Sequence, residues 1–296
     1  MPIESRERSR RHFLKSLVAG GLTLSVDGQA HAQSSSAKDN HMSRIFITGS
    51  TDGLGLAAAR ALIEEGHTVV LHARSPKRAA ALAGLASRSA GLVVGDLGSA
   101  AETRSIAEQV NKIGPMDAVI HNAGVYQIAE RGNTPEGHAT VLAVNTLAPY
   151  ILTALIRRPK RLVYLSSGMH RGANGSLRDI DWHERRWDPS TAYSESKLYL
   201  TALAFAVARH WPDVFSNAVD PGWVPTKMGG PDAPDDLTEG HRTQIWLAAS
   251  QDPQAQVSGR YWHHRKQRTP AAEALDRSFQ DKLVTKLSEL TRVTLP

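Results

Sequence analysis

The sequence predicts an α/β protein whose single domain is built on a doubly wound parallel sheet. Short runs rich in Val, Ile and Leu recur from Arg44 onward, and helix-like segments such as 54–66 and 100–114 separate them. The runs are continuously apolar rather than alternating, which indicates strands buried on both faces. A glycine-rich turn and then a helical segment follow the first run. Together these observations favour parallel strands covered by helices on both sides.

Six segments are expected to form the strands of this sheet. In chain order they are 44–48, 67–73, 91–96, 116–122, 161–167 and 215–221. The chain shows no internal repeat and no second domain. Near its end, five apolar residues recur at helical spacing, which predicts that they pack on the core. These residues are Leu275, Phe279, Leu283, Leu287 and Leu290.

The N-terminal part has a different pattern. The segment 9–15, SRRHFLK, places Arg10 and Arg11 before two apolar residues and a lysine, as in a twin-arginine export signal. A weakly apolar stretch then leads to an Ala-His-Ala triplet, which is typical of a signal-peptidase site. We therefore expect a signal peptide over residues 1–32, a polar linker over 33–43 and the folded domain over 44–296.

Composition excludes several classes of function. The chain has no cysteine, which excludes disulfides, a thiol nucleophile and thiolate metal sites. The apolar stretch 14–26 is too short and too interrupted to span a membrane, so stable membrane insertion is not expected. The net charge is +6, but its one dense run, 263–268, has no nucleic-acid motif around it. We expect that run to form a solvated face rather than to bind a phosphate or nucleic acid.

The turn after the first strand, TGSTDGLG, has the pattern of a dinucleotide-binding Rossmann fold. Gly49 permits a tight turn off the strand, and Gly53 lets backbone N–H groups approach a pyrophosphate. That pyrophosphate would lie at the positive end of the following helix. Gly55 allows the helix to pack closely. The loop residues expected at the cofactor are Gly49, Ser50, Thr51, Gly53, Leu54 and Gly55.

The end of the second strand predicts which dinucleotide binds. In dinucleotide-binding folds an acidic residue at this place binds the adenosine ribose hydroxyls. Arg74 stands there instead, and its planar guanidinium suits a 2′-phosphate. Ser75, Lys77 and Arg78 are expected to add to the same pocket. The sequence therefore favours NADP over NAD, while a simple surface position for Arg74 is the alternative.

Tyr193 and Lys197 form a Tyr-x-x-x-Lys pair that would share one face of a helix. A phenol, with a pKa of about 10, is a poor acid–base at neutral pH. A cation one turn away would lower that pKa, so the pair could exchange a proton with an alcohol or carbonyl oxygen. Such pairs are common by chance. The interpretation of this pair as catalytic is stronger because the pair follows a nucleotide loop, an HNAG strand end and a strand ending in LSS.

These motifs, in this order, resemble those of the short-chain dehydrogenase/reductase family, in its compact single-domain branch, over about residues 44–292. The resemblance implies an NADP-binding oxidoreductase that moves a hydride between the nicotinamide and a carbonyl or alcohol carbon. Tyr193 would be the acid–base, and Lys197 would lower its pKa and hold the nicotinamide ribose. Ser167 would hydrogen-bond the substrate oxygen, and Asn145 would hold a proton-relay water.

The resemblance also implies further cofactor contacts. In the family the Asp of a DL pair contacts adenine, an NAG segment lines the cofactor, and the segment matching DPGWVPT borders the nicotinamide. The matching positions here are Asp96, Leu97, Asn122, Ala123, Gly124, Pro221, Gly222 and Thr226.

The stretch between Ser167 and Tyr193 departs from the family pattern because it is longer than usual, and it resembles the loop of retinol-dehydrogenase-like members. Its aromatic residues could cap a substrate, or they could form a surface hairpin or a dimer contact. They include Trp182, Trp187, His170 and His183. No carboxylate cluster accompanies the histidines, so no metal site is expected.

Two other functions stay open at this stage. A non-catalytic NADP-binding sensor could use the same fold, although the complete Ser, Tyr, Lys and Asn set argues against it. An epimerase or dehydratase is disfavoured by the glycine spacing. The substrate is expected to be a small carbonyl or alcohol compound, and the Gly- and Pro-rich segment 227–241 does not define it. The protein could also form a homo-oligomer.

The signal predicts export to the periplasm, with the twin-arginine machinery as a partner. That machinery carries folded proteins, so the enzyme could fold around a cytoplasmic nucleotide before export. The alternative is that synthesis begins at Met42, because MSRIFITGS resembles the start of a family member. The protein would then be cytoplasmic.

Overall fold

The structure is a computed structural model that describes residues 42–296, so the expected signal peptide and most of the expected linker lie outside the described residues. The strands of this part are β1 (Arg44–Ile47), β2 (Thr68–Ala73), β3 (Gly91–Val94), β4 (Ala118–His121), β5 (Arg161–Leu165), β6 (Phe215–Asp220), β7 (Arg260–His263) and β8 (Lys266–Arg268). They form one sheet in the order β3-β2-β1-β4-β5-β6-β7-β8. Every neighbouring pair is parallel except β7 and β8. The doubly wound parallel sheet is confirmed.

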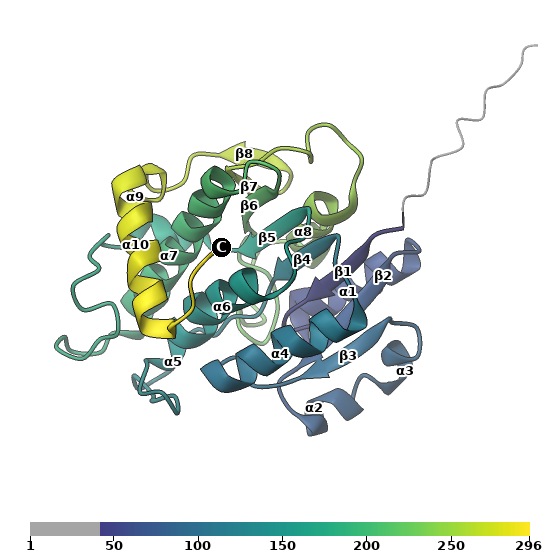
Figure 1. Ribbon diagram of the computed structural model, residues 1–296, viewed down its shortest axis with the longest axis horizontal. Coiled ribbons are helices and arrows are strands. Elements are labelled where there is room, and N and C mark those ends of the chain that lie inside the picture. Colours follow the sequence, from purple (N-terminus) through teal and green to yellow (C-terminus); the bar gives the residue numbers. More distant parts are fainter. Residues whose placement is uncertain (1–41) are drawn as a thin grey trace, which may run out of the picture. The chain divides into compact units, whose positions relative to one another are not determined.

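Helices cover both faces of the sheet (Figure 1). The longer ones are α1 (Gly53–Glu64), α4 (Ala100–Ile113), α6 (Ala148–Leu155), α7 (Pro189–His210), α8 (Leu237–Ala249) and α10 (Arg277–Thr291). The shorter ones are α2 (Pro76–Ala80), α3 (Ala83–Ala86), α5 (Thr140–Leu142), the π-helical turn η1 (Ala143–Leu147), the 3₁₀ helix η2 (Gly168–Gly172) and α9 (Ala272–Leu275). The helices α1 and α8 pack on one face, and α4, α6 and α7 pack on the other, with α10 outside α7.

The central strand β1 shows why a continuous apolar run was a reliable sign of a parallel strand. Ile45 and Ile47 pack against the layer of α1 and α8, while Phe46 between them packs against the layer of α4, α6 and α7. All three side chains are fully buried. Successive side chains of a strand point to opposite faces, so a strand covered on both sides gains from apolar residues at every position.

The C-terminal part of the chain forms a hairpin and two helices. Phe279, Leu283 and Leu287 are buried on α10, but Leu275 belongs to α9 and is 47% exposed. The expected packing is wrong for Leu275, because Asp276 ends α9 and begins a new helix: its side chain accepts the amide of Ser278 and caps α10. The basic run 263–268 forms the β7–β8 hairpin, and all of β8 is exposed, as expected of a solvated face.

None of the helices within residues 42–296 has both the length and the apolar character that crossing a bilayer requires.

Candidate active site

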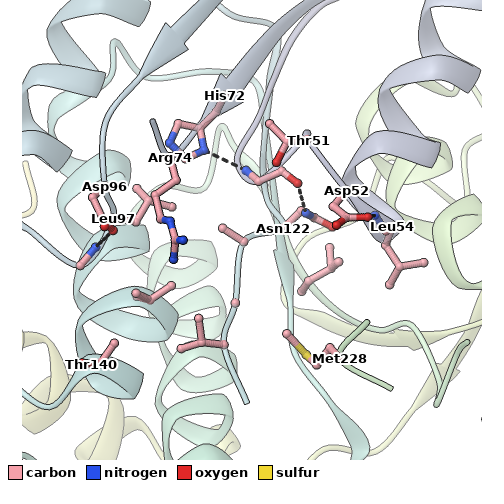
Figure 2. A pocket seen from close by; sticks show the side chains of 18 of the residues that line it. Thr51, Asp52, Leu54, His72, Arg74, Asp96, Leu97, Asn122, Thr140 and Met228 are labelled. Carbon is pink, nitrogen blue, oxygen red and sulfur yellow. Dashed lines mark hydrogen bonds between the residues drawn. The ribbon is translucent and has the colours of Figure 1, made fainter. Parts of the chain in front are cut away.

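A cavity of about 650 Å³ opens where the carboxyl ends of the strands meet. The chain order reverses there, with β1 leading to β2 on one side and β4 to β5 on the other. Open α/β sheets bind ligands at such a switch point. Figure 2 shows labelled side chains from several turns facing this cavity. The predicted site residues that line it are Gly49, Thr51, Gly53, Leu54, Arg74, Asp96, Leu97, Asn122, Ala123, Gly124, Tyr193, Lys197, Pro221 and Thr226.

Five other predicted residues are not among those that line the cavity, namely Ser50, Gly55, Asn145, Ser167 and Gly222. Ser50 is fully buried, and its hydroxyl accepts the amide of His72 at 2.7 Å and donates to Ile47 O. Gly55 lies so close to the end of β4 that a Cβ there would be 2.4 Å from Asn122 Nδ2. In the structure both residues pack the turn against neighbouring strands, and their contact with the cofactor stays a prediction.

The shape of the turn after β1 depends on Gly49 and on the side chain of Asn122. Gly49 has a φ of +66°, and a Cβ there would lie 3.0 Å from the Cα of Ala123. Only glycine combines that dihedral with such a close approach. The Nδ2 of Asn122 donates to Thr48 O at 2.9 Å, which ties the end of β4 to the turn. The end of β4 thus packs directly against the backbone of the turn at Gly49.

Positive charge gathers beside this turn. Arg74 is exposed and lines the cavity (Figure 2). Arg78 also lines it, and its Nη2 donates to Thr51 Oγ1 at 3.1 Å. Of their two neighbours, Ser75 caps α2 by accepting the amide of Arg78, and Lys77 is exposed and is not among the lining residues. The cavity wall beside the turn thus carries two guanidinium groups.

Asp52 is a charged residue of the cavity that the motif did not assign. It caps α1, because its carboxylate accepts the amide of Gly53 at 2.9 Å. The same carboxylate pairs with Lys227 and lies 3.4 Å from Nη2 of Arg78. Lys227 directly follows the segment 220–226 that is expected to border the nicotinamide, so this ion pair links the glycine turn to the chain after β6. An Asp directly before a helix was the signal that could have predicted the cap.

The helix α7 carries Tyr193 and Lys197 on the face that borders the cavity. Nζ of Lys197 lies 5.6 Å from the centroid of the Tyr193 ring and donates to Leu165 O at 2.7 Å. Ser167 hydrogen-bonds the phenol of Tyr193 from the end of β5. The structure thus brings Ser167 next to Tyr193 and Lys197, which are three of the four predicted catalytic residues.

Asn145 lies one layer deeper, in the π-helical turn η1, and is fully buried. Its Oδ1 accepts the amide of Val125 at 2.8 Å, and its Nδ2 donates to Val125 O and to Ser196 Oγ, both at 3.0 Å. Single π turns often mark functional positions because they turn one side chain out of helical register. Here the turned side chain fixes the backbone just after β4, beside Gly124 of the cavity wall.

The pKa of Tyr193 beside Lys197 differs from the expectation. Burial raises the pKa of Tyr193 to about 12, against the opposing effect of the Ser167 hydrogen bond, and the charge of Asp220 acts in the same direction as burial. Burial also lowers the pKa of Lys197 to about 8. The expected lowering of the Tyr193 pKa by Lys197 is wrong for this geometry, because desolvation of the phenolate dominates. At neutral pH the phenol keeps its proton.

The aromatic residues of the long loop do not line the cavity. Trp182 is buried and packs edge-on against Trp187 at a centroid distance of 5.3 Å. Trp187 Nε1 donates to Ile128 O at 3.0 Å. His170 is fully buried, with Nδ1 2.7 Å from Ser167 O and Nε2 accepting the amide of Ala271. Trp182, Trp187 and His170 thus pack within the protein, while His183 is exposed, and a role of the loop as a substrate cap or a dimer contact stays a prediction.

Other lining residues were not predicted from the sequence. They include Asp52, His72, Gly98, Ser99, Glu102, Val125, Asn133, Thr134, Pro135, Thr140, Val144, Leu165, Ser166, Lys227 and Met228. Most lie next to a predicted residue in the chain, but the segment 133–140 carries no motif. Among residues 42–296, no group of three or more His, Asp or Glu side chains is arranged to hold a metal ion.

The fold and the cavity define a dinucleotide-binding α/β enzyme, and comparisons with known proteins give its family. Residues 43–236 match the model of the short chain dehydrogenase family. The chain is 42% identical over 259 residues to the short-chain dehydrogenase chry4 of Gibberella zeae. The aligned region covers 86% of this chain and 99% of that protein. The chain is also 30% identical over 283 residues to retinol dehydrogenase 14 of Mus musculus, and that aligned region covers 82% of this chain and 84% of the relative.

A crystal structure of an uncharacterised protein from Mycobacterium paratuberculosis has the same fold, with a TM-score of 0.74 at 25% identity over 86% of this chain and 95% of that one. The chain belongs to the short-chain dehydrogenase family. It is an oxidoreductase of the kind that acts on CH–OH or C=O groups with a nicotinamide nucleotide.

Proposed function

We propose that the protein is an NADP(H)-dependent oxidoreductase that reduces a carbonyl compound, or oxidises the matching alcohol, with Tyr193 as the acid–base. The observation that carries this proposal is that one cavity holds Tyr193 and Lys197 together with Arg74 and Arg78. When bound, the nucleotide supplies or accepts the hydride. The substrate, a small molecule, would lie beside Tyr193.

The residues present fit a phosphorylated dinucleotide. The turn at Gly49 has no room for a Cβ, and the N-terminus of α1 faces the same cavity, which suits a pyrophosphate. Arg74 and Arg78 supply donors and charge that suit a 2′-phosphate, and no acidic residue stands at the end of β2. This supports a preference for NADP(H) over NAD(H).

The protonation of the catalytic residues supports the reductive direction. With a pKa of about 12, the Tyr193 phenol holds the proton that a carbonyl oxygen needs as it becomes an alcohol. Ser167, hydrogen-bonded to that phenol, is placed to hold the same oxygen. Lys197 is fixed by Leu165 O, so its charge stays near the phenol while the proton leaves.

The proposal is tested by measuring NADPH oxidation with a panel of carbonyl compounds and identifying the products by mass spectrometry. Turnover with a reduced product supports it. Binding of nucleotide without turnover across the panel would favour the sensor alternative, and an isomerised or dehydrated product would favour an epimerase or dehydratase. The oligomeric state of the protein stays a prediction.

We also propose that residues 1–32 direct export to the periplasm through the twin-arginine machinery. The support is the order of features in the sequence: Arg10 and Arg11, then a weakly apolar stretch, then the triplet at 30–32. Transport in the folded state would let the enzyme carry its nucleotide along, because ligand binding stabilises the folded form. Synthesis from Met42, with a cytoplasmic enzyme, is the alternative.

A further inference from the structure

The carboxylate of Asp181, in the long loop between η2 and α7, makes several contacts with the segment after β4. Its Oδ1 accepts the amide of Ala139 at 2.7 Å and Nη2 of Arg131 at 3.2 Å. Its Oδ2 lies 2.5 Å from Nδ1 of His138. Arg131 also donates from Nε to the backbone oxygen of Asp181 at 2.8 Å. The side chain of Asp181 is only 9% exposed, so these bonds are shielded from water.

The segment 131–140 that Asp181 holds is part of the cavity wall. Its residues Asn133, Thr134, Pro135 and Thr140 line the same cavity as Asp96 and Leu97. Figure 2 shows Thr140 on the side of the cavity where Asp96 and Leu97 lie. The segment is also fixed at a second point, because Glu136 accepts the amide of Ala100 at the start of α4 at 2.8 Å.

Arg131 gives this segment its internal shape. Its Nη2 donates to Gly137 O at 3.0 Å, and its own carbonyl accepts the amide of Thr140 at 3.2 Å. The amide of Thr134 donates to His138 O at 2.9 Å, which closes the turn at 134–138. Loss of the carboxylate bonds of Asp181 would leave these contacts within the segment. It would weaken the attachment of the segment to the long loop, which keeps the bonds of Arg131 Nε to Asp181 O and of Trp187 Nε1 to Ile128 O.

We propose that Asp181 is a positioning residue for the nucleotide: through Arg131 and His138 it holds the segment 131–140 against the part of the cavity lined by Asp96 and Leu97. The long loop, whose role the sequence left open, then determines how tightly a nicotinamide nucleotide is bound. The inference rests on the proposed function only in that this cavity binds such a nucleotide.

Charges around Asp181 make the contact depend on pH. The groups that face it are Arg131, His138 and His183, whose Nε2 lies 3.6 Å from Oδ2, with Glu136 acting on His138 from further away. Burial alone would raise the pKa of Asp181, but the hydrogen bonds from His138 and Ala139 hold it below its usual range. The hydrogen bond to Asp181 raises the pKa of His138. The contact is therefore ionic at low pH and weakens as pH rises through the raised pKa of His138.

The first test compares Asp181→Asn with Asp179→Asn in the full-length protein. Asp179 is a matched control, because its carboxylate accepts the amides of His183, Glu184 and Arg185 and stays within the long loop. Asp181→Asn should raise the Kd for both NADPH and NADH about tenfold, or about 1.4 kcal/mol. The turnover number at saturating nucleotide should stay within about twofold. Asp179→Asn should change Kd by less than about twofold. Equal effects of the two variants on Kd would overturn the proposal.

A second pair of variants guards against simple loss of folding. His138→Asn places an amide donor where Nδ1 lies but cannot titrate, whereas His138→Ala removes the donor. The Kd for NADPH should rise as pH rises through the raised pKa of His138 in the unaltered protein, and this rise should be smaller in His138→Asn, in which Lys197 still titrates. His138→Ala should bind more weakly than His138→Asn at every pH. Thermal melts identify variants that are unfolded.

The outcomes separate the two proposals. If the unaltered protein binds neither nucleotide, the proposed function fails. If it binds nucleotide and Asp181→Asn binds equally well, only the role of Asp181 fails.

Discussion

The amide of Gly49 donates a 2.9 Å hydrogen bond to Nδ1 of His72, and Nε2 of the same ring lies 2.9 Å from Gly95 O. An accepting Nδ1 requires a neutral ring with its proton on Nε2, which then donates to Gly95. One neutral imidazole thus connects the turns after β1 and β3, which both border the cavity (Figure 2). Burial lowers the pKa of His72 and keeps the ring in this form.

Acid should destabilise the fold well above the pH at which carboxylates titrate. Burial lowers the pKa of His72, His121 and His170 from 6.5, to about 3 for His121. The unfolded chain therefore binds more protons than the folded one below about pH 6.5, and the free energy of unfolding falls as pH decreases through that range. His138 has the opposite shift, so its contribution is present below its unfolded pKa and is lost above its raised one.

Urea unfolding between pH 4.5 and 8 measures this effect. His72→Asn is the informative variant, because the Asn oxygen can accept the amide of Gly49 but does not titrate. Its stability should depend less steeply on pH below about 6.5 than that of the unaltered protein. A stability that is constant from pH 5 to pH 7 in the unaltered protein would contradict the prediction.

Arg74 should determine the choice of nucleotide. NADPH is expected to bind at least about tenfold more tightly than NADH, because a charge-assisted pair with the 2′-phosphate exists only for NADPH. Arg74→Asp should abolish this preference or reverse it. Both titrations can follow tryptophan fluorescence, since the chain has six tryptophans. Arg88→Asp, which changes an exposed arginine outside the cavity lining, is the control and should keep the preference. Equal affinities in the unaltered protein would refute NADP selectivity.

Tyr193→Phe should remove catalysis while leaving the nucleotide site intact. The variant loses the phenol oxygen and keeps the ring, so turnover should fall by about 10²–10⁴ while the Kd for NADPH changes little. Tyr199→Phe is a matched control on the same helix, because its hydroxyl donates to Ser176 O at 2.8 Å, away from the cavity. That control should lower the melting temperature and keep the turnover. Near-normal turnover of Tyr193→Phe would exclude the proposed acid–base.

Export predicts a periplasmic protein whose first residue is Gln33. Fractionation of the native host, followed by N-terminal sequencing, measures both properties. Replacing Arg10 and Arg11 together by lysine should hold the uncleaved form inside the cell, because the arginine pair is the recognition element. A cytoplasmic protein that starts at Met42 or Ser43 would show that the upstream arginines are not used.

Local sequence determined the layers of this protein. The runs around Ile45 and Phe46 predicted buried strands, because burial on both faces requires apolar residues at consecutive positions. The glycine turn was predictable because the positive φ of Gly49 leaves few alternatives to glycine. Tyr193 and Lys197 were predictable as a pair because helical geometry places residues four apart on one face. Each of these inferences depends only on neighbours in the chain.

The tertiary structure alone decided how those residues behave. The sign of the Tyr193 pKa shift depends on how much water packing removes from the phenol, and no local pattern specifies that. The contacts of His72 with Gly49, and of Asp181 with Arg131 and His138, join positions that are more than a helical turn apart in the chain. Such pairs form only once the sheet brings the strand ends together and excludes solvent, so their strength and their partners follow from packing rather than from sequence spacing.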